Sequence, residues 1–545
     1  MPPTHEVTNQ PPPLRDYNLF EEDRPMQEAV RREGAGWAEP ALSAYGKVAG
    51  TEEVLRWGRE ANEHPPVLRT HDRFGNRIDE VEYHPSWHHL MELAVEQGVH
   101  ALPWREPRPG AHAARAAMMI LGAGVEAGHG CPISMTYAAV PALRAEPELA
   151  AEWEPRLTAS TYDPRLIPAQ DKAGALCGMA MTEKQGGSDV RANTTRAEPL
   201  SGFGEYALTG HKWFCSAPMC DAFLVLAQAP DGLSCFLLPR VLPDGTRNAF
   251  RIQRLKDKLG NRSNASSEVE FEGAWTRLVG KEGRGIPTII EMVNHTRLDC
   301  LLGSTGLLRM AVSQATHHTS HRKAFGTLLH DQPLMRNVLA DLCLESEAAT
   351  AMALRLARAV DEAPGDEEAT LLKRLGIAVG KFWICRSTVG AVAEALECLG
   401  GNGYVEESGM PRLYRETPLN SIWEGSGNVN ALDVLRAVVR TPEALDVFLT
   451  EVDEARSGDR RLDVFADGLQ DELRNRDDLE TRARFLVERL ALAFQASLLV
   501  RHAPPEVADA FCASRLDGRG GRGYGTLPAG IDFVSIIERH RPAMA

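Results

Sequence analysis

Apolar residues recur at helical spacing in two separate parts of the chain. The first part covers residues 36–166, where the pattern is visible over 87–95 and again over 114–121. The second covers residues 286–440, and few glycines or prolines interrupt it. Apolar side chains three or four residues apart lie on one face of a helix. The pattern therefore predicts a helical domain over residues 35–173 and an antiparallel bundle of long helices over residues 286–440.

Residues 174–285, between these parts, have the pattern of β-strands. Short apolar runs over 223–227, 235–238 and 268–271 alternate with turn signals such as Asp231-Gly232. Such runs, bounded by Asp-Gly pairs, are typical of strands joined by tight turns. We therefore predict a small antiparallel β domain over residues 174–285, with a hairpin over residues 208–216 that carries Trp213.

The two ends of the chain differ from these three regions. Residues 1–34 contain prolines at 11–13 and show no clear period, so we expect an arm that lies over the body of the protein. Residues 441–545 are rich in helical signals to about residue 504 and include a tract of Gly and Arg over 517–525. The whole pattern predicts an α+β multidomain protein with an extra C-terminal helical domain over residues 441–545.

The composition is that of an ordinary globular protein. Of its 545 residues, 43% are hydrophobic and 25% are charged, and the net charge is -15. An acidic chain has no global attraction for nucleic acid or anionic membranes. We expect no apolar stretch near the roughly 20 residues that span a membrane and no signal peptide. We therefore expect a cytoplasmic protein.

Cysteines and histidines give no sign of a metal site. The ten cysteines include no C-x-x-C pair, which favours reduced, mostly buried thiols over disulfides or a zinc site. His317 and His321 are four residues apart, but no H-E-x-x-H pattern or cysteine partner accompanies them. We interpret these two and His318 as surface histidines. The glycines at 122–128 follow a helical pattern and do not indicate a Rossmann fold.

A Gly-rich polar segment follows the first predicted strand of the β domain. Met181 and Thr182 leave the strand, and Gly186, Gly187 and Ser188 follow them. Peptide N–H groups and a hydroxyl in such a loop are suited to binding an anion or a polar ring system. The alternative is a plain connection between a strand and a turn.

Glu424 is a candidate general base near the end of the bundle. It lies between Trp423 and a Gly-Ser-Gly turn, just before a predicted helix. A carboxylate beside an indole in a partly dry pocket should have a raised pKa, which suits a base that works near neutral pH. The alternative is a solvated glutamate near a helix start.

Five motifs occur in the order and spacing of the acyl-CoA dehydrogenase family. They are Met-Thr-Glu with Gly-Gly-Ser-Asp from Met181, the segment around Trp213, Arg-Lys-Ala-Phe-Gly from Arg322 followed by Gln332, Leu-Gly-Gly-Asn-Gly from Leu399, and Trp-Glu-Gly-Ser from Trp423. The chain resembles that family from about residue 35 to residue 440. The resemblance implies a helical N-terminal domain, an antiparallel β-barrel and a C-terminal four-helix bundle.

The resemblance also implies a bound FAD and an acyl-CoA substrate. In the family, the glutamate at the position of Glu424 removes the α proton of the thioester as the β hydride passes to flavin N5, and its N–H stabilises the enolate oxygen. Met181, Thr182 and Ser188 would contact the flavin ring and phosphates, and Trp213 would cover the isoalloxazine. The other implied cofactor-binding residues are Gly187, Phe214, Cys215, Ser216, Arg322, Phe325, Gly400, Gly401, Trp423, Gly425, Ser426 and Asn428.

Part of this implied site belongs to a neighbouring subunit. In the family, residues at the positions of Arg322, Phe325 and the Gly400-Gly401 turn reach the adenine or pyrophosphate portion of the neighbour's FAD. The resemblance therefore implies a homotetramer, or at least a dimer.

Four residues depart from the usual family pattern. Trp423 stands where the family commonly has Tyr, Ser426 where it has Thr, and Glu397 where it has Gln. Cys215 replaces a Thr whose hydroxyl faces flavin N5, and a thiol is the weaker donor. We therefore expect weak or unusual dehydrogenation rather than efficient β-oxidation.

The extra C-terminal length and the N-terminal arm, together with the segments 182–190, 254–266, 411–415 and 420–428, resemble the branch of the family that responds to DNA alkylation. That resemblance implies double-stranded DNA as a partner, although residues 440–545 contain 15 Arg, no Lys and 19 Asp plus Glu. Any DNA contact must then come from local arginines. The candidates are Arg436, Arg440, Arg515, Arg519 and Arg522. The alternatives are a flexible tract with solvated arginines, a metabolic acyl-CoA dehydrogenase for a branched or unusual substrate, and a DNA-shielding protein with structural FAD.

Overall fold

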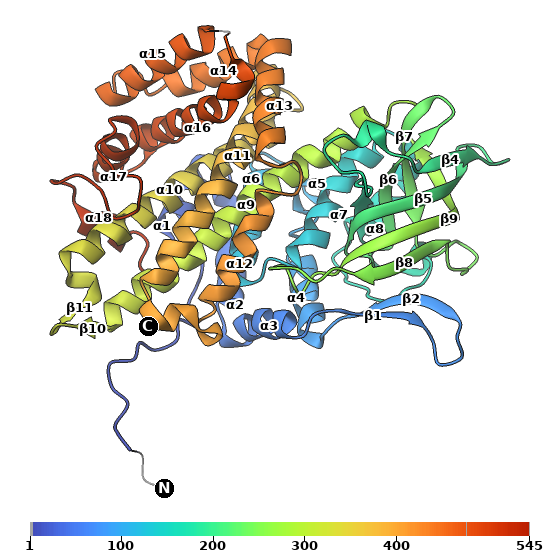
Figure 1. The fold of residues 1–545 in the computed structure, drawn as a ribbon, viewed down its shortest axis with the longest axis horizontal. Coiled ribbons are helices and arrows are strands. Elements are labelled where there is room, and N and C mark those ends of the chain that lie inside the picture. Colours follow the sequence, from blue (N-terminus) through green and yellow to red (C-terminus); the bar gives the residue numbers. More distant parts are fainter. Residues whose placement is uncertain (1–3, 476, 544–545) are drawn as a thin grey trace. The chain divides into compact units, whose positions relative to one another are not determined.

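The computed structural model describes residues 4–475 and 477–543, which form two compact units (Figure 1). The first unit contains residues up to 55, residues 108–125 and residues from 300 onward. The second contains residues 56–107 and 126–299. Each unit therefore combines segments that are far apart in the sequence.

The second unit contains helices and a β-hairpin in its N-terminal part. Pro85 opens one of these helices, and the side chain of His84 accepts a hydrogen bond from the Ser86 N–H at its start. The hairpin was not predicted, because its strands are short and mostly polar. The elements are α3 (Glu52–Glu63), which begins in the first unit, β1 (Val67–His71), β2 (Arg77–Glu82), α4 (Pro85–Glu96), α5 (Leu102–Arg105), α7 (Gly130–Leu143) and α8 (Pro147–Leu157).

The second unit also contains a seven-stranded sheet, followed by the first part of α9 (Gly285–His321). Its strand order is β3-β6-β4-β5-β9-β7, with β8 beside β9, and the β6–β7 pairing closes the sheet into a barrel. The barrel is confirmed, but β6 pairs in parallel with β3 and β4, so the sheet is mixed rather than purely antiparallel. The strands are β3 (Cys177–Ala180), β4 (Arg196–Pro199), β5 (Glu205–Ser216), β6 (Ala222–Ala229), β7 (Gly232–Pro239), β8 (Phe250–Leu255) and β9 (Ser266–Val279).

Aromatic side chains fill the barrel. Phe223 and Phe250 stack with ring centroids 5.2 Å apart, and Phe271 lies 5.8 Å from Phe250. The hairpin predicted over residues 208–216 is wrong, because these residues lie within the single strand β5. The hairpin that carries Trp213 is instead formed by β4 and β5, whose antiparallel pairing starts at Pro199 and Tyr206.

Long helices form the core of the first unit. Gly376 and Gly380 lie against the Leu356 side chain, and a Cβ at either position would come within 3.0 Å of it, so two of these helices pack closely. The helices are α1 (Arg24–Arg32), α2 (Glu39–Ala49), α6 (Ala111–Val125), α9 (Gly285–His321, from Cys300 onward), α10 (Pro333–Glu362), α11 (Glu367–Glu397), α12 (Met410–Asn420) and α13 (Gly427–Arg440).

Two elements of this unit differ from the prediction. Helix α1 lies in the segment that was predicted to be an arm without a period, and it buries Met26, Ala29 and Val30. Helix α11 is long and apolar enough to cross a membrane, against the expectation of no such stretch. Because 72% of its apolar window is buried within the protein, α11 is a core helix of the bundle.

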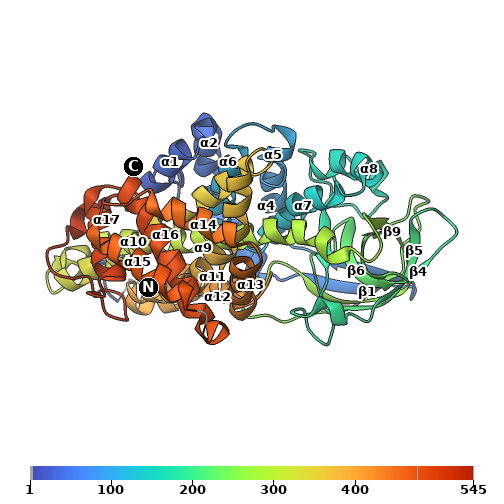
Figure 2. The same cartoon turned by 90° about the horizontal axis from the view of Figure 1, so that it is seen from above.

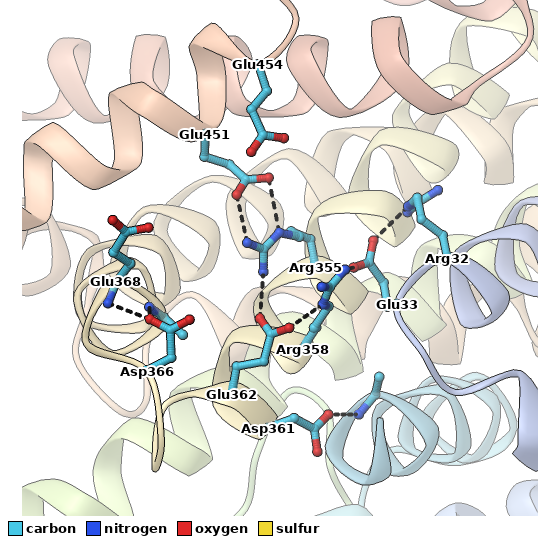
Figure 3. A network of polar contacts seen from close by, with 12 residues as sticks. Arg32, Glu33, Arg355, Arg358, Asp361, Glu362, Asp366, Glu368, Glu451 and Glu454 are labelled. Atoms are coloured by element: carbon cyan, nitrogen blue, oxygen red, sulfur yellow. Dashed lines mark hydrogen bonds and ion pairs between the residues drawn. The ribbon is translucent and has the colours of Figure 1, made fainter. Parts of the chain in front are cut away.

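The C-terminal addition packs against the bundle helices (Figure 2). Arg355 of α10 donates a 2.7 Å hydrogen bond to Glu451 (Figure 3). Glu451 also accepts a 2.7 Å hydrogen bond from Arg501. Although burial raises the pKa of Glu451, the two guanidinium groups hold it below its usual range. The addition consists of α14 (Pro442–Asp453), α15 (Arg460–Arg474), α16 (Leu479–His502), α17 (Pro505–Phe511) and α18 (Phe533–Glu538).

The structure tests the predictions for the cysteines and for the histidines at 317, 318 and 321. All ten cysteines are buried, which confirms the prediction of mostly buried thiols, and all ten are free. The prediction of surface histidines is wrong for His317 and His318, which are 2% and 7% exposed. His317 hydrogen-bonds the Pro12 carbonyl at 2.8 Å, so the N-terminal arm covers it. Within residues 4–475 and 477–543, no group of three His, Cys, Asp or Glu is arranged to hold a metal ion.

Candidate active site

One buried carboxylate anchors the Gly-rich loop that follows β3. Glu183 is fully buried and accepts hydrogen bonds from the N–H groups of Thr194 and Thr195, at 2.6 and 3.1 Å. The Lys212 ammonium donates to the same carboxylate at 2.8 Å. Although burial raises the pKa of Glu183, these partners hold it at about 2. The loop is therefore fixed at its centre by an ionised side chain.

The rest of this loop presents hydroxyl groups and bare backbone. Thr182 is half-buried, whereas Gly187 and Ser188 are exposed. A Cβ at Gly187 would lie 2.4 Å from the Thr182 hydroxyl, so only glycine allows this close approach. The Trp213 N–H donates to the Thr182 carbonyl at 2.8 Å, which ties the loop to β5. The prediction placed Met181 here, and it is half-buried beside Thr182.

A bulge in β5 turns two aromatic rings outward. The pairing of β5 with β9 shifts between Lys212 and Cys215, so Trp213 is partly exposed and Phe214 is 49% exposed. The Lys256 ammonium lies 3.6 Å from the centroid of the Trp213 ring and 4.5 Å from that of Phe214. The bulge therefore presents aromatic rings beside Lys256, whose ammonium also donates to Glu268 at 2.7 Å.

Cys215, which the sequence predicts to be a flavin contact, is buried. It has no exposed surface, and burial raises the pKa of its thiol to about 12. Its carbonyl accepts a 2.9 Å hydrogen bond from the Ser267 hydroxyl, inside the barrel. The same bulge that exposes Trp213 and Phe214 turns the Cys215 side chain inward, while Ser216 stays half-buried.

In the first unit, Arg322 and Phe325 lie on a short hairpin after α9. This hairpin consists of β10 (Lys323–Ala324) and β11 (Thr327–Leu328), and Phe325 at its tip is fully exposed with φ +52°. Asn9 of the N-terminal arm accepts from the Lys323 N–H at 2.7 Å and donates to the Lys323 carbonyl at 2.9 Å. Arg322 donates to the Asn9 carbonyl at 2.5 Å. The arm therefore fixes the base of the hairpin.

The Gly400-Gly401 turn is an exposed backbone surface of the same unit. Gly400 has φ +59°, a conformation that favours glycine. A side chain at either glycine would meet no atom within 4 Å, so the bare peptides face open space. Asn402 donates to the side chain of Gln10 at 3.2 Å, which brings the N-terminal arm to this turn as well.

Glu424 occupies a tight turn between α12 and α13. Its φ is +56°, a left-handed conformation that is uncommon for a residue with a side chain. The Lys381 ammonium donates to the carbonyl oxygens of Trp423, at 2.6 Å, and Gly425. The Trp423 indole N–H donates to Oδ1 of Asn420 at 2.9 Å, which ties the turn to the end of α12. The turn is held on both sides of the half-buried Glu424.

The residues after this turn open helix α13. Ser426 precedes the helix with extended backbone, and the Asn430 side chain donates to its carbonyl at 3.1 Å. Asn428 accepts a 2.8 Å hydrogen bond from Nε of Arg484, which belongs to α16 of the C-terminal addition. The first N–H groups of a helix lack partners within it, so Ser426 and Asn428 lie where a polar ligand would find donors.

The candidate DNA-contacting arginines fall into two groups. Arg436, Arg440, Arg519 and Arg522 have exposed side chains. Arg515 does not fit the prediction, because only 18% of its side chain is exposed and it pairs with Asp341 at 2.5 Å. It fastens the start of the Gly- and Arg-rich tract to α10.

Sequence reasoning missed Lys381 and Arg484, which hold the Glu424 turn and the segment after it. A signal existed for Lys381, because it is the single charged residue in an otherwise apolar and glycine-containing run over 375–385. No comparable signal existed for Arg484, which is one of many arginines in the C-terminal addition.

Three family models match the chain in succession. Residues 9–164 match the adaptive response protein AidB N-terminal domain. Residues 178–274 match the acyl-CoA dehydrogenase middle domain, and residues 283–439 match the acyl-CoA dehydrogenase C-terminal domain.

Similar proteins extend the match over almost the whole chain. AidB of Escherichia coli K12 is 49% identical over 95% of both chains. Acyl-CoA dehydrogenase family member 11 of Caenorhabditis elegans is 30% identical over 83% of this chain and 78% of its own. The crystal structure of C. elegans ACDH-11 in complex with C11-CoA superposes with a TM-score of 0.87, at 27% identity over 94% of both chains.

The fold, the motifs and these matches place the chain in the acyl-CoA dehydrogenase family. Within the family, the chain is of the AidB type, since both the N-terminal model and the match along 95% of the E. coli protein are to AidB.

Proposed function

We propose that the protein is an FAD-containing, AidB-type oxidoreductase that removes hydrogen from an acyl-CoA. The observation that carries this proposal is the turn at Glu424, a carboxylate held in a fixed left-handed conformation with its flanking carbonyls bound to Lys381. The family commonly uses the residue at this position as the base. The proposal also includes a cytoplasmic location and a homotetramer.

The donor set of the second unit fits a flavin nucleotide. The Thr182 and Ser188 hydroxyls make no hydrogen bond within residues 4–475 and 477–543, and Gly187 leaves bare backbone between them. Trp213 and Phe214 offer aromatic faces. In the first unit, Ser426 and Asn428 at the start of α13 offer further polar groups for phosphate.

In the proposed reaction, Glu424 and Trp423 have different roles. Glu424 takes the α proton of the thioester, and its N–H donates to the carbonyl oxygen on which negative charge develops. Trp423 narrows the space beside the base, which favours an unusual acyl chain. FAD, when bound, accepts the β hydride and so supplies the redox chemistry.

Anaerobic titration of the FAD-loaded protein tests the proposal. C11-CoA and a panel of straight and branched acyl-CoA esters should bleach the flavin absorbance with at least one thioester. Glu424→Gln keeps the size of the side chain and should abolish the bleaching. Bleaching that persists in Glu424→Gln, or a protein that takes up no FAD, contradicts the proposal.

A metabolic acyl-CoA dehydrogenase is the second candidate. The observation that favours it is the full-length structural match to ACDH-11, whose structure was determined in complex with C11-CoA. In this case the protein passes electrons to an electron-transfer flavoprotein. Multiple turnovers with such an acceptor support this candidate, whereas a single slow reduction of the flavin supports weak dehydrogenation of the AidB type.

The proposal further includes protection of double-stranded DNA during alkylation stress. The exposed Arg519 and Arg522 support it, since both lie in a Gly-rich tract without internal ion pairs in the described residues. If FAD is only structural, Glu424→Gln leaves alkylation resistance of cells unchanged, while charge reversal at both arginines reduces it. The opposite result assigns the protection to redox chemistry.

A further inference from the structure

Lys381 is a fully buried ammonium group beside the Glu424 turn. It lies in the middle of α11 and is 1% exposed. Its two hydrogen-bond acceptors are peptide carbonyl oxygens, those of Trp423 at 2.6 Å and of Gly425. An ammonium group is rarely buried without a strong reason, because removing its charge from water is unfavourable. The two hydrogen bonds to the turn therefore account for the burial of the Lys381 ammonium.

The two carbonyls that Lys381 binds flank one residue, Glu424. Both carbonyls bind the same Nζ atom across the turn at Glu424, whose φ is +56°. Gly425, the next residue, also has a positive φ, of +100°. Conformations of this kind persist only where their surroundings hold them, and they cluster at functional sites. Asn430 adds a second donor to the Gly425 carbonyl, at 2.5 Å.

The two hydrogen bonds also place a positive charge against the backbone on both sides of Glu424. Charge-assisted hydrogen bonds to an ammonium group are stronger than those between neutral groups. In a buried setting, a fixed positive charge favours negative charge on neighbouring groups more than it would in water. The Glu424 carboxylate and the enolate bound at its N–H are both negative in the proposed reaction. Lys381 is thus arranged to serve geometry and charge together.

We propose that Lys381 is a positioning residue for Glu424, which fixes the left-handed turn through both flanking carbonyls and supplies the positive charge that favours its ionised carboxylate. This inference rests on the proposed function of Glu424 as the base. It adds a residue from the middle of α11, which none of the five family motifs contains.

The first test measures the turn itself. Amide hydrogen exchange of the FAD-loaded protein is followed by mass spectrometry in peptides that cover residues 420–428. In Lys381→Met, which keeps the chain length and removes the charge, exchange there should be at least about tenfold faster. Lys373→Met is the matched control on the same helix and should leave this exchange unchanged. Equal exchange in Lys381→Met and wild type overturns the inference.

The second test measures proton removal without hydride transfer. The FAD-loaded protein is kept reduced and anaerobic in D2O with C11-CoA, and NMR follows deuterium at the α carbon. Glu424 breaks the C–H bond and leaves its electron pair on the thioester as the enolate, and a deuteron returned from the exchanged carboxyl forms the C–D bond. Lys381→Met should slow this exchange by about 10- to 100-fold and shift its pH midpoint upward.

Two further variants distinguish a failure of the inference on Lys381 from a failure of the proposed function of Glu424. If Lys381→Met does not fold, Lys381→Arg decides, because it keeps the charge but changes the geometry. It should slow the exchange while the pH midpoint stays at the wild-type value, and an unchanged rate overturns the inference. If Glu424→Gln exchanges as fast as wild type, the proposed base is wrong, and the amide exchange of the turn alone then decides the role of Lys381.

Discussion

Arg484 donates a 2.8 Å hydrogen bond from Nε to Oδ1 of Asn428. Arg484 lies on α16, in the C-terminal addition, whereas Asn428 is in the first turn of α13 and follows the Glu424 turn. The family model for the C-terminal domain ends at residue 439, before the addition begins. A residue from outside the three matched domains therefore contacts the candidate cofactor segment.

Arg484→Ala should weaken FAD retention by about tenfold. The variant removes one hydrogen bond to a charged group, worth about 1.5 kcal/mol, and about 1.4 kcal/mol corresponds to a tenfold change in affinity. Ultrafiltration at a series of free FAD concentrations measures the effect. Arg482→Ala, on the same helix, is the control and should retain FAD as wild type does. If Arg484→Ala retains FAD as well as wild type does, α16 does not support the flavin site.

Asn9→Ala should loosen the hairpin that carries Arg322 and Phe325. The substitution removes both side-chain hydrogen bonds to Lys323, at 2.7 and 2.9 Å. If this hairpin reaches the FAD of a neighbouring subunit, the variant should dissociate at higher protein concentration and lose FAD faster. Analytical ultracentrifugation and flavin fluorescence measure these effects. Thr8→Ala changes an exposed neighbour and is the control. An unchanged assembly and FAD loss rate would contradict this role of the arm.

The ion pair between Glu183 and Lys212 should make stability depend on pH in the acidic range. The pKa of Glu183 is lowered from 4.5 to about 2 in the folded protein. A carboxyl with a depressed folded pKa stabilises the fold above its unfolded pKa and loses this contribution as the pH falls. The stabilisation by Glu183 should therefore be complete above about pH 4.5 and decline toward pH 2.

Glu183→Gln tests this pH dependence. Because it leaves the buried Lys212 without its carboxylate, it should cost about 3–5 kcal/mol of unfolding free energy at pH 7. The difference from wild type should shrink as the pH falls below about 4.5. Urea unfolding at several pH values measures it. The double variant Glu183→Gln with Lys212→Met should recover part of the loss, and a deficit that does not change with pH contradicts the assignment.

The fold was predictable from the sequence wherever a local hydrophobic pattern was strong. The helical period of the bundle and the short apolar runs of the barrel, such as the buried run of β6 that contains Phe223, are local patterns that the sequence displays directly. The parallel pairing of β3 with β6 was not predictable, since a local pattern carries no information on which distant strand lies beside it. The polar hairpin β1–β2 lacked the short apolar runs on which the prediction of strands depends.

The candidate site, too, was predictable from the sequence only in part. Glu424 and the Gly-rich loop were found through motifs that are contiguous in the sequence. The burial of the Cys215 side chain was not predictable, because it depends on a single bulge in β5. Arg484 and Asn9 reach the site from distant segments through side-chain hydrogen bonds. Such partners are set by tertiary packing, which spacing along the chain does not describe.

The exposed and paired arginines of the C-terminal tract should respond differently to substitution. Charge reversal at Arg519 and Arg522 should weaken binding of duplex DNA and lower the slope of log affinity against log salt by about 0.9 for each phosphate that is no longer neutralised. Unfolding should be unaffected, because both side chains are exposed. Arg515→Ala should instead lower stability, because it leaves the buried Asp341 without its 2.5 Å partner. Fluorescence anisotropy at several salt concentrations, paired with thermal unfolding, separates the two effects. If the slope of log affinity against log salt stays at the wild-type value after both charge reversals, this tract does not contact DNA.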